Sequence, residues 1–177
     1  VRAMHEPRST IHGIRWHLVG HLQSNKAKLA VELFDVIHSV DSVSLIQALE
    51  RQAKQAAKAV EVFIQVNVSG ETTKFGCRPD EVTALVDALR GCRQLTPAGL
   101  MTLAPFSENP EEARPHFRKL RQLRDALQTG RVTQSLHRAL PPSLTLSMGM
   151  SQDFEVAIEE GADVIRIGTA IFGERRT

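Results

Sequence analysis

The segment Leu146-Ser147-Met148-Gly149-Met150-Ser151-Gln152-Asp153-Phe154 passes from an apolar strand, through a glycine, into a helix. The same order recurs along the chain, where short β-branched runs alternate with longer segments of helical period, which is typical of a parallel α/β fold. Several runs are almost continuously apolar, as expected for strands buried on both faces. We therefore expect six strands: Arg15–Gly20, Phe34–Val40, Val62–Val68, Ala98–Leu103, Leu144–Met148 and Val164–Gly168.

The segments between these strands carry signals for the start and end of helices. The clearest is Asn109-Pro110-Glu111-Glu112, where an N-cap asparagine precedes a proline at the first helical position, and Gly130 marks the end of this helix. Three further helices are expected: from Pro79 to Gly91, from near Ser42 to about Ala59, and from Ser151 to Gly161. The least regular stretch, Thr129–Ser143, predicts a long loop.

Six βα units fit one domain that extends over residues 1–177. A closed eight-unit barrel typically needs about 250 residues, so the count falls about two units short of closure. Two architectures remain open at this point: an open six-stranded sheet, or a TIM-type (β/α)8 barrel that has lost one end. The second would expose two unpaired strand edges, which favour pairing with another chain.

Composition and charge exclude several classes of function. The 22 Lys and Arg residues are interleaved with 20 Asp and Glu residues, which is typical of a solvated helix surface and not of nucleic-acid binding. Cys77 and Cys92 form no CxxC motif, so we expect neither a metal site nor a disulfide framework. No apolar run approaches the roughly 18 residues of a membrane span, and the start, Val1–Glu6, has no apolar signal core. We therefore expect a cytoplasmic domain without a membrane or nucleic-acid partner.

Two turns at successive strand ends predict a phosphate site. Gly149 allows a tight turn, and Ser151 is placed to cap the following helix, whose first N–H groups are free to bind an anion. At the end of the next strand, Gly168 permits close approach to the backbone and Thr169 adds a hydroxyl. Each residue alone fits an ordinary cap or turn, but the loops after the last two strands of (β/α) barrels often form a phosphate cup.

Arg166 lies within an apolar strand two positions before the second of these turns. Its side chain is therefore expected to point into the mouth of the barrel. Because an unpaired charge there is costly, Arg166 must face either an acid or a ligand. The acid alternative is an internal ion pair, for example with Asp163 or Glu155.

Other polar and sulfur-containing residues give weaker signals. His17 is expected to bond a neighbouring backbone group within its strand, and Asn67 lies at the strand end that carries ligand contacts in such folds. Asn25 and Lys26 open a helix, which they would cap unless they contact an anion. The methionines are interpreted as core residues that fill space: Met101, Met148 and Met150.

The segment Trp16-His17-Leu18-Val19-Gly20-His21-Leu22-Gln23-Ser24-Asn25-Lys26 resembles the most distinctive segment of the pyridoxal 5′-phosphate (PLP) homeostasis protein family. The resemblance covers nearly the whole chain from Ile14 to Arg175. It continues, in order and with plausible spacing, through Ile64–Asn67, Lys74–Gly76, Gly99–Met101, Leu146–Asp153 and Arg166–Gly173.

This resemblance implies the barrel that alanine racemases have as their N-terminal domain, with PLP as the cofactor. It further implies that Arg166 hydrogen-bonds the pyridine nitrogen of PLP. The phosphate would be held by Ser151, Gly168 and Thr169, and the residues near the ring would be Asn67 and Met148. Family members have no well-defined catalytic reaction and are thought to buffer or deliver the cofactor, so we expect a binding protein and not an enzyme.

The chain departs from the family pattern at its start. The resemblance places the Schiff-base lysine on the first barrel strand, followed by a helix and by a second strand with a Gly-Glu-Asn segment. The thirteen residues before Ile14 resemble neither segment, and three other lysines match different family positions: Lys26, Lys28 and Lys74. We therefore expect an N-terminally incomplete barrel that binds PLP non-covalently.

Two further functions remain open. A PLP-dependent amino-acid racemase of the same fold uses a tyrosine base from a second β domain, and this chain contains no tyrosine. A barrel that binds a sugar phosphate or a nucleotide would keep the two turns, but it gives no reason for Arg166. A complete barrel is expected to be a monomer, whereas the open strand edges of an incomplete one allow association.

Overall fold

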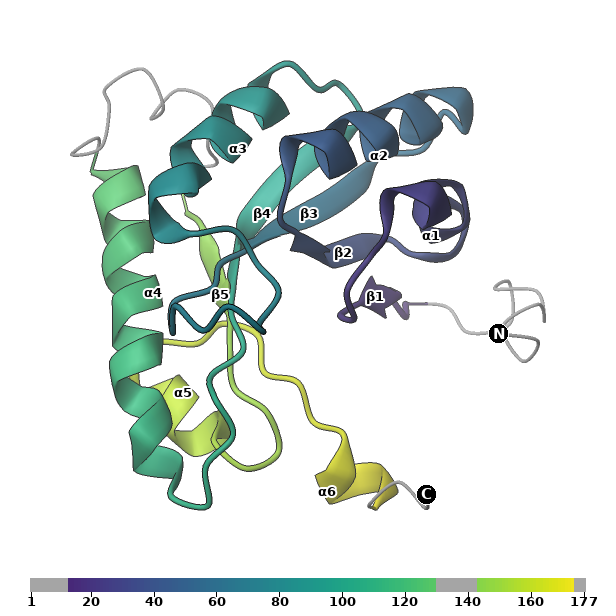
Figure 1. The fold of residues 1–177 in the computed structure, drawn as a ribbon. Helices are drawn as coiled ribbons and strands as arrows, with labels where there is room; N and C mark the ends of the chain where they lie inside the picture. The colour runs from purple at the N-terminus through teal and green to yellow at the C-terminus, as the bar shows by residue number, and fades with distance from the viewer. Residues whose placement is uncertain (1–12, 130–142, 174–177) are drawn as a thin grey trace.

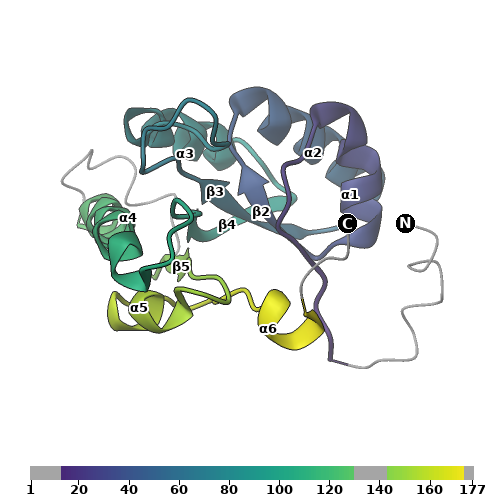
Figure 2. The same ribbon diagram turned by 60° about the horizontal axis from the view of Figure 1, so that its bottom comes forward.

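A computed structural model of the protein describes residues 13–129 and 143–173. In these residues five parallel strands are hydrogen-bonded in the order in which they occur along the chain. The sheet is curved, and helices cover its outer face (Figures 1 and 2). The strands are β1 (His17–Leu18), β2 (Val36–Val40), β3 (Val60–Gln65), β4 (Leu95–Met101) and β5 (Thr145–Ser147).

The strand order distinguishes between the two architectures that the sequence left open. A doubly wound sheet reverses its strand order at a switch point, whereas a barrel adds each new strand beside the previous one. The observed order β1-β2-β3-β4-β5 has no reversal. The fold is therefore a half-barrel of parallel strands of the TIM type.

The prediction of a sixth strand at Val164–Gly168 is wrong. Val164 forms only an isolated bridge with Ser147, and the pairing stops there. Gly149 has a φ of +92°, so the backbone turns away from the strand direction, and the N–H of Arg166 donates to the carbonyl of Gly149 at 3.0 Å. Gly168 is already the N-cap of the next helix.

The helices begin near the predicted signals. The Asn109 side chain accepts the Glu111 N–H at 3.2 Å, and the Ser42 side chain accepts the Leu45 N–H at 3.4 Å. Of the predicted loop Thr129–Ser143, residues 130–142 lie outside the described residues. The α-helices are α1 (Ala27–Leu33), α2 (Val43–Gln55), α3 (Val82–Arg90), α4 (Arg114–Gln128), α5 (Phe154–Glu159) and α6 (Thr169–Phe172), and 3-10 turns at Ser24–Lys26, Pro79–Glu81 and Pro110–Ala113 precede α1, α3 and α4.

Both faces of the sheet are buried. The outer face packs against the helices in one large cluster, in which α2 and α4 supply fully buried side chains such as Leu49 and Phe117. The inner face has a smaller apolar cluster of Val36, Phe63 and Met101. Because side chains alternate along a strand, His38 lies on the same face as Val36. His38 is thus a buried polar residue of the inner face.

Gly99 controls how closely β4 and β5 approach. It pairs with Thr145, and a Cβ at position 99 would lie 1.9 Å from the Thr145 backbone oxygen. We expect Gly99→Ala to lower the free energy of unfolding by about 2 kcal/mol or more, because the two strands must separate to admit the methyl group. Urea denaturation measures this loss.

Gly91→Ala is the matched control, since a Cβ at Gly91 would lie at an ordinary 3.5 Å from the Ala88 oxygen. Its effect should stay within about 0.5 kcal/mol. A Gly99→Ala protein as stable as the Gly91→Ala protein would contradict the prediction.

Candidate functional site

Arg166 is the only arginine or lysine among the buried residues of the described chain, and it is 9% exposed. Its Nη1 donates to Ser147 Oγ at 2.6 Å, and its Nη2 donates to the carbonyl oxygen of Thr102 at 2.7 Å. Nε donates to the sulfur of Met150 at 3.4 Å. The guanidinium thus lies at the ends of β4 and β5, where three neutral groups hold it.

No carboxylate lies within ion-pair distance of Arg166 in residues 13–129 and 143–173. Asp163 instead accepts the Leu146 N–H at 2.7 Å, and Glu155 is exposed on α5, so the internal ion pair is wrong for both residues. Burial lowers the pKa of Arg166 to about 10, an effect that the charge of Asp153 opposes. The guanidinium remains charged at neutral pH, and a buried cation of this kind is costly without a strong acceptor.

The structure brings Ser151, Gly168 and Thr169 together, and we call these residues the serine–glycine turns. Ser151 Oγ accepts the N–H of Gly168 at 3.0 Å and the N–H of Ala170 at 3.3 Å. The prediction that Ser151 caps the helix that follows it is therefore wrong. That helix, α5, begins at Phe154, and the side chain of Asp153 accepts the Met150 N–H in the turn before it.

An open pocket of about 760 Å³ lies against the serine–glycine turns. Besides these three residues, it is lined by Phe106, Met150, Gln152, Phe172 and Gly173. A Cβ at Gly168 would meet no atom within 4 Å, so nothing in the described chain crowds that side of the backbone. Met150 both lines this pocket and contacts Arg166, and it thereby connects the two parts of the site. Its interpretation as a core residue is wrong, since it is 39% exposed.

Asn67 and Met148 do not line this pocket. The Asn67 amide holds the following loop: its Nδ2 donates to the carbonyls of Glu71 and Lys74, while its Oδ1 accepts from Ser69 and Gly70. Met148 is fully buried in the large core cluster, as the interpretation of it as a core residue predicted. Their proximity to a ligand ring stays a prediction.

A chain of hydrogen bonds that the sequence did not indicate extends from Arg166 across the inner face of the sheet. Ser147 Oγ lies 2.9 Å from His38 Nδ1, and His38 Nε2 lies 2.8 Å from His17 Nδ1. The His38 ring stacks on Phe63, with centroids 4.3 Å apart. The prediction that His17 bonds a backbone group is therefore wrong, because its ring partner is a histidine of the neighbouring strand.

Both histidines are kept neutral. Burial lowers the pKa of His38 to about 3, and the positive charge of Arg166 and the neighbouring His17 act in the same direction. Burial also lowers the pKa of His17, with Arg15 contributing. In this hydrogen-bond chain, the positive charge at neutral pH therefore lies on Arg166.

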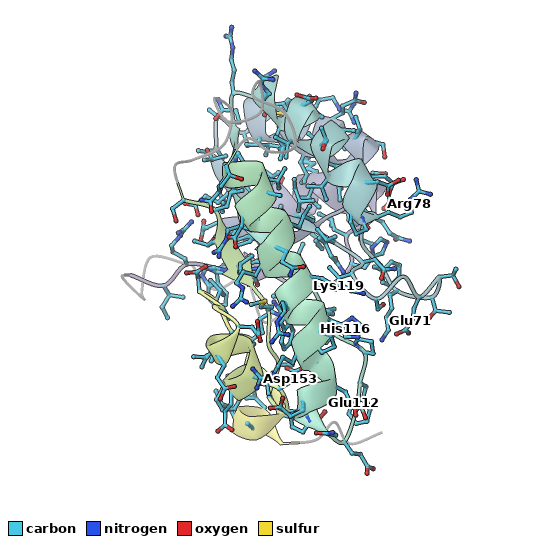
Figure 3. All side chains as sticks on the ribbon, turned by 90° about the vertical axis from the view of Figure 1, so that its left-hand side faces the viewer. Glu71, Arg78, Glu112, His116, Lys119 and Asp153 are labelled. Atoms are coloured by element: carbon cyan, nitrogen blue, oxygen red, sulfur yellow. The ribbon has the colours of Figure 1, made fainter. Side chains whose placement is uncertain are left out.

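The rest of the described chain offers no other obvious chemistry. Glu112, in the 3-10 turn before α4, lies with His116 and Lys119 of α4 on the side that faces the loop with Glu71 (Figure 3). No group of three or more His, Cys, Asp or Glu side chains there or elsewhere in the described ranges could hold a metal. Burial raises the pKa of the two cysteine thiols, to about 12 for Cys77 and about 11 for Cys92. Among the described residues, no helix has the length and apolar character needed to cross a membrane.

Comparisons with known proteins place this site in context. Residues 3–176 match the family model of the alanine racemase N-terminal domain. The chain is 45% identical over 163 residues to the pyridoxal phosphate homeostasis protein of Aquifex aeolicus, and the match covers 92% of this chain and 68% of that protein. The protein of the same name from Bos taurus is 39% identical, and the match covers 92% of this chain and 59% of that protein.

Solved structures agree with this similarity. PipY from Synechococcus elongatus, solved with PLP bound, matches with a TM-score of 0.80 and 36% identity over 93% of this chain and 73% of that one. An alanine racemase from Clostridium difficile matches with a TM-score of 0.72 over 96% of this chain and 42% of that one. At 12% identity, this second likeness shows the fold alone.

The buried neutral state of His38 predicts a pH-dependent stability. The unfolded chain binds a proton at this histidine below about pH 6.5, whereas the folded chain does so only near pH 3. Because the unfolded state binds more protons in this window, the free energy of unfolding falls as the pH falls, by up to about 1.4 kcal/mol per pH unit from this residue.

Urea denaturation between pH 7 and pH 4.5 measures this slope. The His38→Gln variant cannot take up the proton, so its stability should fall less steeply with decreasing pH. Parallel pH dependences for the parent and the variant would show that His38 does not contribute.

Proposed function

Because the chain belongs to the pyridoxal phosphate homeostasis protein family, on the fold of the alanine racemase N-terminal domain, we propose that it binds PLP to buffer or deliver the cofactor. The observation that carries this proposal is the buried Arg166, which has no carboxylate partner among the described residues and lies next to a pocket lined by the serine–glycine turns. PipY, which is 36% identical to this chain, has been solved with PLP bound.

The serine–glycine turns are suited to the phosphate end of PLP. Ser151 Oγ accepts two backbone N–H groups, so its own hydrogen remains available to donate to a phosphate oxygen. Thr169 adds a second hydroxyl at the exposed rim of the pocket. Gly168 leaves open space where a side chain would otherwise stand. These features fit an anion with several acceptor oxygens.

Arg166 is suited to the ring end. Its three bonds to described residues use three of the five N–H groups of a guanidinium, which leaves two for a ligand. A guanidinium donates and does not give up its proton, so a pyridine nitrogen opposite Arg166 stays unprotonated. PLP supplies an electron-withdrawing ring to its enzymes, and an unprotonated nitrogen weakens that property. Arg166 therefore favours holding the cofactor over carbanion chemistry.

The binding unit that we propose is a single domain formed by this chain, without a catalytic reaction of its own. The chain spans 68% of the Aquifex aeolicus relative and 59% of the Bos taurus relative. In this proposal, the contacts described above are the phosphate and ring contacts of the site. Asn67 acts, in this proposal, through the loop that its amide holds, and Met148 acts as a packing residue of the core.

The first test replaces Arg166 by Leu and measures the affinity for PLP and, separately, for inorganic phosphate. We expect the affinity for PLP to fall at least tenfold, since a hydrogen bond to a charged group contributes about 1.5–3 kcal/mol. The affinity for phosphate should change less than about twofold, because phosphate lacks the ring. Absorbance or fluorescence titration with PLP, and displacement of PLP by phosphate, give both values.

Arg90→Leu is the matched control, because Arg90 lies on the outer helix α3 and pairs with Asp87. It should bind PLP as the parent does. Equal loss of PLP and phosphate binding in Arg166→Leu would move Arg166 to the phosphate and contradict the ring contact.

The second test replaces Ser151 by Ala. This change removes a donor to the phosphate and the acceptor that holds the N–H groups of Gly168 and Ala170. We expect the affinities for PLP and for inorganic phosphate to fall together, by about tenfold. Pyridoxal, which has no phosphate, should bind the variant and the parent equally weakly, and a PLP affinity that is unchanged in Ser151→Ala would exclude Ser151 from the phosphate site.

A further inference from the structure

We propose that Ser147 and His38 are positioning residues for Arg166, and that with His17 they form a hydrogen-bond chain of one fixed direction. In this chain the Arg166 Nη1–H donates to Ser147, the Ser147 hydroxyl donates to His38 Nδ1, and His38 Nε2–H donates to His17 Nδ1. The role of this hydrogen-bond chain in ligand binding rests on the proposed function, whereas the direction of its hydrogen bonds does not.

The direction follows from what each group can donate. Arginine has N–H groups and no acceptor, so Ser147 Oγ must accept at the 2.6 Å contact with Nη1. If His38 Nδ1 also donated to Ser147, the serine hydrogen would be left without an acceptor at a side chain that is fully buried. Such an unsatisfied donor is costly. The serine therefore donates to His38, whose single proton must lie on Nε2.

The surroundings of His38 support the neutral form with its proton on Nε2. The ring is 1% exposed and stacks on Phe63 at an interplanar angle of 10°, which fixes its orientation. A protonated ring would add a second positive charge beside Arg166, and both the burial and that charge lower its pKa. His17, at the far end of the chain, is exposed, so its remaining N–H can reach solvent.

Together with Thr102, the hydrogen-bond chain fixes the plane of the Arg166 guanidinium. The Thr102 N–H donates to the Ser147 carbonyl at 3.1 Å, and its hydroxyl donates to the Val66 carbonyl at 2.8 Å. The acceptors for Nη1 and Nη2 are therefore both locked to strand ends and linked to each other. A donor held in this way loses little freedom on binding a ligand ring, which is how preorganised sites gain affinity.

The direction is tested by long-range ¹H–¹⁵N NMR of the histidine rings at neutral pH, without ligand. We expect His38 Nδ1 to resonate as an unprotonated nitrogen and His38 Nε2 as a protonated one. In Ser147→Ala, which removes the donor to Nδ1, the two nitrogen shifts should move toward each other as both neutral forms become populated. A proton on His38 Nδ1 in the parent would overturn the proposed direction.

The positioning role is tested by the affinity for PLP of Ser147→Ala against Ser39→Ala. Ser39 is a matched control, because its hydroxyl is also fully buried in β2 but has no hydrogen-bond partner in the described structure. We expect Ser147→Ala to weaken PLP binding about tenfold and Ser39→Ala to change it less than twofold. An unchanged affinity in Ser147→Ala, or an equal loss in both variants, would overturn the positioning role.

The two measurements separate this inference from the proposed function. A parent protein that shows the expected nitrogen shifts but does not bind PLP would overturn the proposed function, and the positioning toward PLP with it, while the hydrogen-bond chain would stand. A parent that binds PLP but fails the NMR test would leave the proposed function intact and overturn the chain.

Discussion

The burial of one positive charge constrains the whole inner face of this half-barrel. Arg166 is held by neutral acceptors from the ends of β4 and β5, without a carboxylate partner in the described structure. Neutralising such a charge internally would require an acid on the same face, yet the side chains that follow Arg166 there are Ser147 and then His38, whose pKa is about 3. The fold therefore keeps its inner face cationic and directs that charge toward the strand ends, where the serine–glycine turns line an open pocket.

The two faces of the sheet serve different purposes. The outer face carries the large apolar cluster against the helices, which contains most of the buried apolar residues. The inner face has only a small apolar cluster, beyond which buried polar side chains follow toward the carboxyl ends of the strands. The close approach of β4 and β5 at Gly99 affects both faces of the sheet, because it sets the spacing of the two strands whose ends hold Arg166. The position of the two acceptors of Arg166, Ser147 and Thr102, thus depends on the backbone packing at Gly99.

Local pattern was sufficient to predict most of the fold but only part of the site. Alternating periods located the five strands and the main helices, because each signal lies within a short window. Ser151 and Gly168 were predicted to meet, since successive strand ends of a barrel share one face, and Ser151 Oγ does accept the Gly168 N–H. Arg166 does not itself line the pocket beside them. The partners of His38 could not be predicted, because Ser147 lies 109 positions away and no local signal records the pairing. The prediction of a sixth strand failed because the backbone turns at Gly149, which shifts the hydrogen bond of the Arg166 N–H to the Gly149 carbonyl.

The strand order also determines when the site can exist during folding. Neighbouring strands pair over short stretches of chain, so each can dock on the one before it with a small loss of loop entropy. The bond between His38 and Ser147 closes a far longer loop and joins β2 to β5, which are not paired with each other. It can form only after the intervening strands have assembled in register. Opening of the sheet between β2 and β5 therefore separates His38 from Ser147.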